Sequence, residues 1–284
     1  MKKRFLLLVL LVVLLLGGCK PTNTTTSAID TTGLDDYTQF VEMFTEAKDK
    51  FLNSESFILK EEAVLEYEQN ESLYRFYFIT HQEQIKEPFY VKSTITTLGL
   101  NMPKIKMLIM KNDTNNTYSM YLKLGDEEPI VTILTQNELE EALENASLET
   151  TLNSIPKNVE ISEKKINGNI EEITYQSSYK LTDLETEDQH LFDEILKLYI
   201  GDDVDIENYH NIPVKQTITI NKTLKELISI TYDASDIAQQ MFDDLALEQS
   251  FSKLTNIKLT YTFTFISINK TTIDENFVKE VKGE

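Results

Sequence analysis

The sequence lacks the residues and motifs that most often carry catalysis or bind metals. It contains one cysteine, three histidines and no tryptophan in 284 residues. A single cysteine excludes an internal disulfide and a cysteine-rich zinc site. The GxSxG, HExxH, P-loop and GxGxxG motifs are all missing, and the lack of tryptophan weakens the case for a sugar-stacking groove. We therefore expect a protein that is not an enzyme and that needs no cofactor.

Basic residues are scarce as well. Lysine and arginine number 27 against 47 aspartate and glutamate residues, which gives a formal net charge of -20. Binding to nucleic acid needs clustered Lys and Arg to neutralise phosphates, so this balance argues against a nucleic-acid partner. The hydrophobic fraction of 41% is too high for a disordered chain. The sequence therefore predicts a folded, acidic protein.

The N-terminus has the pattern of a targeting segment. A basic start, Met1 to Arg4, precedes twelve apolar residues from Phe5 to Leu16. This length fits the hydrophobic region of a signal peptide and is short for a membrane-spanning helix. Two glycines follow, and then Cys19, which is the only cysteine of the chain.

The segment Leu16-Gly17-Gly18-Cys19 resembles the lipobox of bacterial lipoproteins. The resemblance implies cleavage between Gly18 and Cys19 and a diacylglyceryl group on the sulfur of Cys19. Two acyl chains bind a membrane stably where one does not. We therefore expect a protein that is lipid-anchored at the extracytoplasmic face of the cell membrane. The alternative is an ordinary cleaved signal peptide with an incidental cysteine.

Three segments follow from this interpretation. Residues 1–18 form the signal peptide, residues 19–33 the lipidated cysteine with a flexible tether, and residues 34–284 a single domain. The tether contains six threonines, a proline and a glycine, without apolar periodicity. A flexible segment of this length spans on the order of 20 Å, so the domain can stand clear of the membrane.

The spacing of apolar residues predicts a helix, then many strands interrupted by helices. Apolar residues three and four apart predict helices over residues 34–53, 137–153, 186–200 and 235–247, and we assign the N-cap of the second to Asn137. The alternating segments predict strands over 57–68, 73–80, 89–98, 104–111, 117–124, 129–135, 159–166, 170–181, 213–221, 224–232 and 256–268. Asn167-Gly168 is a strong hairpin signal between two of them.

The last strand shows the alternation most clearly. Its apolar residues, such as Tyr261 and Phe263, alternate with Lys258 and threonines. A strand of this kind buries one face and exposes the other to water. About eleven such strands with short turns predict an α+β fold with one large, curved antiparallel sheet. A doubly wound nucleotide fold is not expected, because no strand–helix–strand unit with a Gly-rich turn is present.

The order of signal peptide, lipobox, tether, helix and about eleven antiparallel strands resembles the LolA-like superfamily. This group includes the LolA and LolB carriers and the mycobacterial LppX and LprG lipoproteins. The resemblance implies a half-barrel that wraps a few helices and holds a lipid acyl chain in the cavity between sheet and helices. It rests on element order, so no ligand residue can be transferred by position.

We expect the ligand cavity to be lined by the apolar rows of four strands. These residues are Ile105, Met107, Ile109, Met120, Leu122, Ile218, Ile220, Tyr261, Phe263 and Phe265. The leading hypothesis is a membrane-anchored protein that binds or carries a lipid or another hydrophobic ligand. The alternative is a surface binding or structural module, such as an adhesin, a receptor or an accessory subunit, with a filled core and no ligand. An envelope hydrolase is a third hypothesis.

No metal site is expected. His81, His190 and His210 lie far apart in the sequence, and we expect His81 and His210 to be surface loop residues. The segment from Asp203 to Glu207 begins like a calcium loop, but Asn208 replaces the turn glycine and no glutamate follows at the bidentate position.

Overall fold

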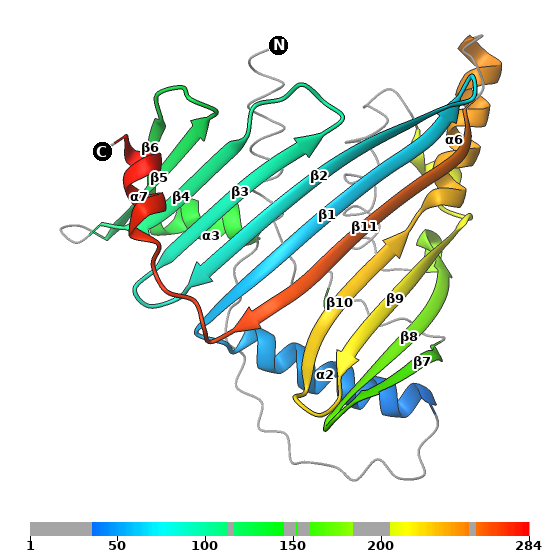
Figure 1. Ribbon diagram of the computed structural model, residues 1–284, viewed down its shortest axis with the longest axis horizontal. Helices are drawn as coiled ribbons and strands as arrows, with labels where there is room; N and C mark the ends of the chain where they lie inside the picture. Colours follow the sequence, from blue (N-terminus) through cyan, green and yellow to red (C-terminus); the bar gives the residue numbers. More distant parts are fainter. Residues whose placement is uncertain are drawn as a thin grey trace.

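The computed structural model describes residues 36–112, 116–144, 152, 159–183, 205–249 and 254–283. Its strands form one antiparallel sheet in the order β6-β5-β4-β3-β2-β1-β11-β10-β9-β8-β7 (Figure 1). The strands are β1 (Ser56–Gln69), β2 (Ser72–Ile85), β3 (Tyr90–Leu98), β4 (Ile105–Lys111), β5 (Thr117–Leu124), β6 (Ile130–Thr135), β7 (Glu160–Asn167), β8 (Ile170–Lys180), β9 (Pro213–Asn221), β10 (Glu226–Asp233) and β11 (Thr255–Ile268). The predicted antiparallel sheet of about eleven strands is therefore confirmed.

Four α-helices accompany the sheet in the described part of the chain. They are α2 (Asp36–Leu52), α3 (Gln136–Glu144), α6 (Ser235–Gln249) and α7 (Glu275–Lys282). Short 3-10 helices cover Leu181–Asp183 and Ile206–Tyr209. Helices α2, α3 and α6 pack on one face of the sheet, which we call the inner face, and α7 packs on the opposite, outer face (Figure 1).

The two long central strands connect the ends of the chain. β1 pairs with β2 through a tight turn and with β11 from the other end of the sequence. In this register Leu59, Ala63 and Leu65 lie opposite Phe265, Tyr261 and Leu259, respectively. Because side chains alternate between the faces of a strand, these six residues share the inner face. The alternation of apolar and polar residues along these strands thus determines which face of the sheet is buried.

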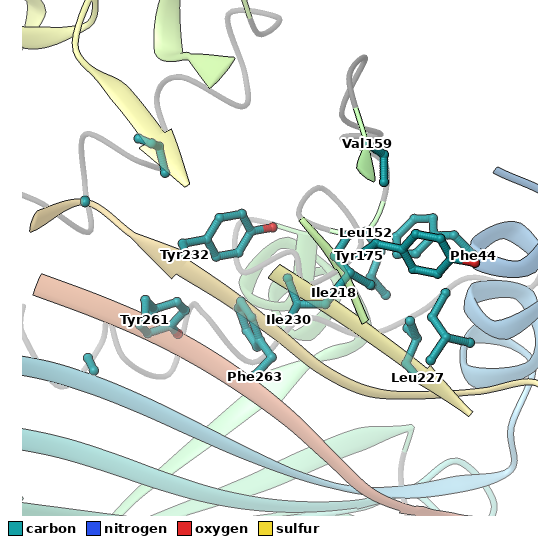
Figure 2. Close-up of a cluster of buried hydrophobic side chains, with 14 of the residues drawn as sticks. Phe44, Leu152, Val159, Tyr175, Ile218, Leu227, Ile230, Tyr232, Tyr261 and Phe263 are labelled. Carbon is teal, nitrogen blue, oxygen red and sulfur yellow. The ribbon is translucent and has the colours of Figure 1, made fainter. Parts of the chain in front are cut away.

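The inner face carries two hydrophobic clusters. The larger joins β1, β8, β9, β10 and β11 to helices α2 and α6. The smaller joins β3, β4 and β5 to Leu139 of α3. Figure 2 shows part of the larger cluster, in which Ile218, Ile230 and Phe263 come from three neighbouring strands. Close packing of this kind buries apolar surface and stabilises the fold.

Helix α7 was not predicted from the sequence. It has only eight residues, which is too short for apolar periodicity to be distinctive. The side chain of Asp274 caps its N-terminus by accepting a hydrogen bond from the Phe277 amide at 3.1 Å. Gly283 ends the helix in the left-handed conformation, with φ of 77°. Phe277 and Val281 pack on the outer face against Tyr90 of β3.

Several local predictions need correction. The helix assigned to residues 137–153 begins at Gln136, and its cap is Thr135 rather than Asn137. Thr135 and Glu138 form a capping box, in which each side chain accepts a hydrogen bond from the backbone amide of the other residue. Thr135 is therefore the N-cap residue. Strand β2 runs on to Ile85, which places His81 within a strand instead of at its end.

His210 is buried, with 6% of its surface exposed, whereas a surface loop position was expected. The loop before β9 is hydrogen-bonded to the 3-10 helix that follows β8, because the carbonyl of His210 accepts from the Thr182 amide. The two segments are distant in the sequence, so the position of His210 is not visible in the local sequence.

The lipobox from Leu16 to Cys19, the tether and the predicted helix 186–200 lie outside the described residues. None of the described helices combines the length and apolar character needed to cross a membrane.

Candidate functional site

The ten residues predicted to line a cavity all lie on the inner face, but in two separate groups. Ile218, Ile220, Tyr261 and Phe263 belong to the larger cluster, with Phe265 packed against it. Ile105, Met107, Ile109 and Leu122 belong to the smaller cluster, with Met120 packed against it. Whether they enclose a ligand stays a prediction. Their positions show that strands β1, β2 and β3 lie between the two groups.

The larger group is packed against aromatic residues of α2. Phe51 contacts Phe265 edge-on, with ring centroids 4.9 Å apart, and contacts Phe57 of β1 at the same distance. Tyr261 and Phe263 are themselves 4.9 Å apart in an edge-to-face arrangement. Such pairs are geometrically specific and fix the rings in place. This part of the inner face is therefore a rigid apolar wall.

The smaller group forms a second apolar wall on β4 and β5. Met107 and Leu122 lie opposite each other in the sheet, as do Ile109 and Met120. Helix α3 covers this wall with Leu139 and with Gln136, whose side-chain oxygen accepts a hydrogen bond from Tyr118. The two methionines are flexible, adaptable side chains.

A band of buried polar side chains separates the two walls. We call this set the polar band: Glu61 of β1, Thr80, Gln82 and Gln84 of β2, and Ser93 and Thr97 of β3. Five of the six are buried, with Ser93 fully inaccessible and Glu61 4% exposed. Thr97 is half-buried, but its hydroxyl oxygen is inaccessible.

The strand register makes the polar band continuous. Glu61 lies opposite Thr80 on the neighbouring strand, and Gln82 lies opposite Ser93. Residues directly opposite in an antiparallel pair have Cβ atoms roughly 5 Å apart. Gln82 and Gln84 are joined by a long side-chain hydrogen bond of 3.4 Å. The band therefore runs diagonally from Glu61 through Thr80 and Gln82 to Ser93, with Leu59 opposite Gln82 on β1 and Ile95 opposite Thr80 on β3.

The oxygen atoms of the polar band are mostly left without partners. Four buried atoms find no hydrogen-bond partner in the part of the chain that the structure describes: Glu61 Oε1, Gln82 Oε1, Ser93 Oγ and Thr97 Oγ1. An unsatisfied buried polar group costs about 1–3 kcal/mol. Native proteins keep few such groups, and each calls for an explanation. Three of them, on Glu61, Gln82 and Ser93, lie on three neighbouring strands, whereas Thr97 lies beyond Ile95 on β3.

Glu61 is the most polar member of the band. Its second carboxylate oxygen accepts a hydrogen bond from the hydroxyl of Tyr261 at 2.6 Å. Burial raises the pKa of the Glu61 carboxyl from 4.5 to about 7, and the bond from Tyr261 opposes that rise. Loss of hydration disfavours the charged form of a carboxyl, which explains the direction. The neighbouring basic residues Lys60 and Lys92 point to the outer face, because they occupy the alternate positions of β1 and β3.

The arrangement is suited to binding rather than to catalysis. The polar band offers hydrogen-bond acceptors and three hydroxyls in an apolar surrounding, with one carboxyl and no nucleophile paired to a base among its residues. No group of three His, Cys, Asp or Glu residues is placed to hold a metal ion in the described residues. Sites that combine apolar walls with a few polar groups are typical of small-ligand binding.

Sequence reasoning did not identify the polar band, although a signal was present. Residues 57, 59, 63 and 65 are apolar and share one face of β1, and Glu61 interrupts that row. Likewise Val91 and Ile95 share the inner face of β3 with Ser93 between them. A polar residue at a buried position of a strand is the pattern that could have revealed the band.

The outer face carries a polar groove of about 940 Å3. It runs over the strands from β2 to β7 and is lined by hydroxyl, amide and charged side chains, among them Tyr77, Thr262, Thr231, Lys215 and Gln176. It faces away from both apolar walls. This groove and the inner face are therefore two separate surfaces of the sheet.

No family model and no curated protein matches the sequence. Solved structures similar to it include the lipoprotein LppX from Mycobacterium tuberculosis, at 10% identity and a TM-score of 0.43 over 83% of this chain and 98% of that one. LprF from Mycobacterium bovis is similar at 9% identity and a TM-score of 0.45, over 83% and 95% of the two chains. A putative outer membrane lipoprotein-sorting protein domain from Vibrio parahaemolyticus has 9% identity and a TM-score of 0.28, over 88% and 100%. With TM-scores below 0.5, membership of the LolA-like superfamily stays a prediction.

Proposed function

We propose that this chain is a membrane-anchored extracytoplasmic lipoprotein that binds or carries a lipid or another hydrophobic ligand on the inner face of its sheet. The observation that carries the proposal is the polar band, in which four buried oxygens find no partner among the described residues and which lies between two apolar walls. A ligand with an apolar body and a polar group fits that alternation.

The cost of unpaired buried groups favours the binding of a ligand that can pair with them. Each unpaired buried group costs about 1–3 kcal/mol, and a bound polar group that reaches several of them recovers part of this cost. The apolar walls supply further affinity, about 0.8 kcal/mol for each methylene that leaves water. Binding through burial and hydrogen bonds requires neither a metal nor a catalytic group.

The N-terminal resemblance to a lipobox supports the location. A diacylglyceryl group on Cys19 holds the domain at the membrane surface, where lipid ligands are abundant, and a flexible tether gives it room to move. The ligand-binding face is then within reach of the bilayer from which it takes its cargo.

The experiment compares lipid retention in two single-residue variants. The full chain is expressed with its own N-terminus, purified in detergent, and weighed by native mass spectrometry. Ser93→Leu places a larger apolar side chain on the inner face, where it occupies the ligand's space. Thr94→Leu makes a similar change at the next residue, on the outer face.

We expect a bound lipid in the wild type and in Thr94→Leu, and at least a tenfold lower occupancy in Ser93→Leu. Ser93→Val is the milder variant if thermal unfolding shows that Ser93→Leu does not fold. Equal lipid occupancy in a folded Ser93 variant and in Thr94→Leu contradicts the proposal, as does a wild type without any lipid.

The outer polar groove favours the second candidate, a surface binding module. Its lining of hydroxyls, amides and charges suits a hydrophilic partner. This candidate predicts that the purified wild type carries no lipid besides the one attached to Cys19, and that a protein partner is recovered with it from intact cells.

A further inference from the structure

Two hairpin turns form one surface at the end of the sheet where β7 meets β8 and β9 meets β10 (Figure 1). The Thr223 hydroxyl accepts a hydrogen bond from the Glu171 amide at 2.9 Å and donates one to the Asn169 carbonyl at 3.2 Å. The Lys222 amide donates to the Glu171 carbonyl at 2.8 Å. These bonds join the β7–β8 turn to the β9–β10 turn.

Apolar side chains stand on this surface in contact with water. Ile166 is 77% exposed, the highest value of any large apolar side chain in the described residues, and Leu224 and Ile170 are 47% and 39% exposed. We call these three residues the tip patch. In the described part of the chain, no atom except those of its chain neighbours lies within 4 Å of where a Cβ atom on Gly168 would stand. The β7–β8 turn therefore projects from the domain and holds apolar groups in the solvent, which is typical of a contact surface.

The charges around the tip patch balance, although the whole chain is strongly acidic. Residues 163–172 and 221–226 contain four lysines and four glutamates, whereas the chain has 27 basic and 47 acidic residues. The balance is also local, since Lys165, for example, pairs with Glu163 at 2.8 Å. A bilayer with anionic lipids repels an acidic surface. The end of the sheet with the tip patch brings no net charge to such a bilayer.

The tether precedes an element at the same end of the molecule. Helix α2 begins at Asp36, and Figure 1 shows it along the end that carries the tip patch. The helix is joined to the β9–β10 turn, because Lys50 donates to the Leu224 carbonyl at 2.7 Å. A flexible segment with the length of residues 19–33 spans on the order of 20 Å. A lipid on Cys19, on which this step rests as part of the proposed function, keeps the tip patch within reach of the membrane.

The opposite end of the sheet is less suited to a membrane. The β1–β2 turn at that end also carries exposed apolar residues, Leu73 and Tyr74. Residues 66–75, however, contain three glutamates and one arginine, so this turn is acidic. Strand β1 has fourteen residues and spans about 45 Å at about 3.3 Å per residue. A flat membrane that contacts one end therefore cannot contact the other.

We infer that the tip patch lies in the head-group region of the membrane, so that the domain contacts the bilayer through the β7–β8 and β9–β10 turns as well as through its lipid anchor. A stable protein–protein interface buries about 1,200 Å2 or more, which two narrow turns do not offer. A lipid interface, in contrast, accepts small apolar groups. Because the anchor makes this contact intramolecular, a weak affinity is enough to populate it.

The absence of tryptophan from the chain allows a direct test. Ile166→Trp and Leu73→Trp each give the chain its only tryptophan, at exposed positions on opposite ends of the sheet. The full chain with its own N-terminus is reconstituted into phosphatidylcholine vesicles and recovered by flotation. Part of the phosphatidylcholine carries a doxyl quencher close to the head group. The measured quantity is the fraction of tryptophan fluorescence that this lipid quenches.

We expect the tryptophan of Ile166→Trp to be quenched at least about threefold more than that of Leu73→Trp, because interfacial apolar groups lie about 5–10 Å into the head-group boundary. Adding Ile170→Ser and Leu224→Ser to Ile166→Trp removes the rest of the tip patch and should lower the quenching toward the Leu73→Trp value. Adding Leu98→Ser instead removes an exposed apolar side chain near the opposite end and should leave the quenching unchanged.

Equal or stronger quenching of Leu73→Trp overturns the inference, and this is also the result expected if the tip patch binds a protein instead of a membrane. Quenching of Ile166→Trp that is unaffected by the two serine substitutions overturns it as well. In both cases flotation of the chain with the vesicles shows that the lipid anchor stands. If the full chain does not float with the vesicles, the anchor of the proposed function fails and the inference fails with it.

Discussion

Single residues on this sheet have opposite effects according to the face they occupy. Glu61 and Glu62 are adjacent in the sequence, yet Glu61 is buried on the inner face and Glu62 forms an ion pair with Lys60 on the outer face. An ion pair exposed to water contributes little to stability. A carboxyl that is buried and bonded through one oxygen instead makes stability depend on pH.

The first prediction concerns that pH dependence. The Glu61 pKa is about 7 in the folded chain and 4.5 when unfolded, so the folded state holds the proton more tightly. The free energy of unfolding therefore falls as pH rises from about 4.5 to about 7, and the loss is complete above pH 7. At about 1.4 kcal/mol per pKa unit, the penalty is about 3 kcal/mol.

Glu61→Gln does not titrate and should escape this loss. Urea unfolding should show that its stability relative to the wild type improves by about 3 kcal/mol between pH 4.5 and pH 8. Glu62→Gln should stay parallel to the wild type across this range. A constant difference between Glu61→Gln and the wild type at every pH would show that Glu61 ionises normally.

The secondary-structure elements differ in how well they could be predicted from the sequence. Strands β5 and β9 were predicted with their observed bounds, because strict alternation is a local signal. Helix α7 was missed because its eight residues are too few for a distinctive periodicity, and the burial of His210 was missed because it depends on contacts with distant segments. The polar band was missed for the same reason: Gln82 and Ser93 become neighbours only through the strand pairing.

The second prediction tests the cap of α7. Asp274 caps the helix through the Phe277 amide and also pairs with Lys92. Lys92 accordingly holds the pKa of Asp274 below its usual range, with help from the Phe277 amide. Asp274→Ala should destabilise α7 by about 1 kcal/mol, the usual effect of losing an N-cap.

Hydrogen exchange measures this effect locally. Amides of residues 275–282 should exchange faster in Asp274→Ala, while those of β1 and β11 stay protected, because terminal helices open independently of a core. Asn276→Ala alters an exposed residue of the same helix and should leave the exchange unchanged. Faster exchange throughout the sheet would mean that α7 does not open independently of the sheet.

A third prediction concerns α2 as a wall of the inner face. Phe51 contacts both Phe57 and Phe265, so it ties the helix to β1 and β11. Phe51→Ala should lower the free energy of unfolding by about 3–5 kcal/mol, as is usual for a buried phenylalanine. Thermal unfolding monitored by circular dichroism checks it, with exposed Tyr37→Ala on the same helix as the control. A loss below 1 kcal/mol would show that α2 is only loosely packed.

At the scale of the whole molecule, the sheet has two distinct surfaces, and the N-terminal sequence resembles a lipobox. The inner face combines apolar walls with buried acceptors, and the outer face combines α7 with an open polar groove. The sequence predicted the sheet and the apolar rows because both follow from alternation. The sequence could not predict that the apolar rows form two separate groups, because their separation by β1, β2 and β3 depends on the strand order of the assembled sheet.

The fourth prediction tests the proposed lipid anchor at Cys19. Cells given an alkyne analogue of palmitate should label the wild-type chain and not Cys19→Ser, because the proposed lipoprotein carries its acyl chains on a diacylglyceryl group bound to the Cys19 sulfur. The N-terminal peptide of the wild type should begin at residue 19. Thr22→Ser, a change of similar size in the tether, should keep the label. Labelling of Cys19→Ser at the wild-type level would contradict the lipoprotein interpretation.

The most direct measurement maps where a lipid contacts the chain. The full-length protein is illuminated with a dipalmitoylglycerol that carries a diazirine in one acyl chain, and the cross-linked peptides are identified by mass spectrometry. The account predicts adducts on inner-face residues of β1, β3 and β4, such as Ile95 and Met107, and their loss when unlabelled dipalmitoylglycerol is in excess. Adducts confined to the outer face, or unaffected by that excess, would contradict it.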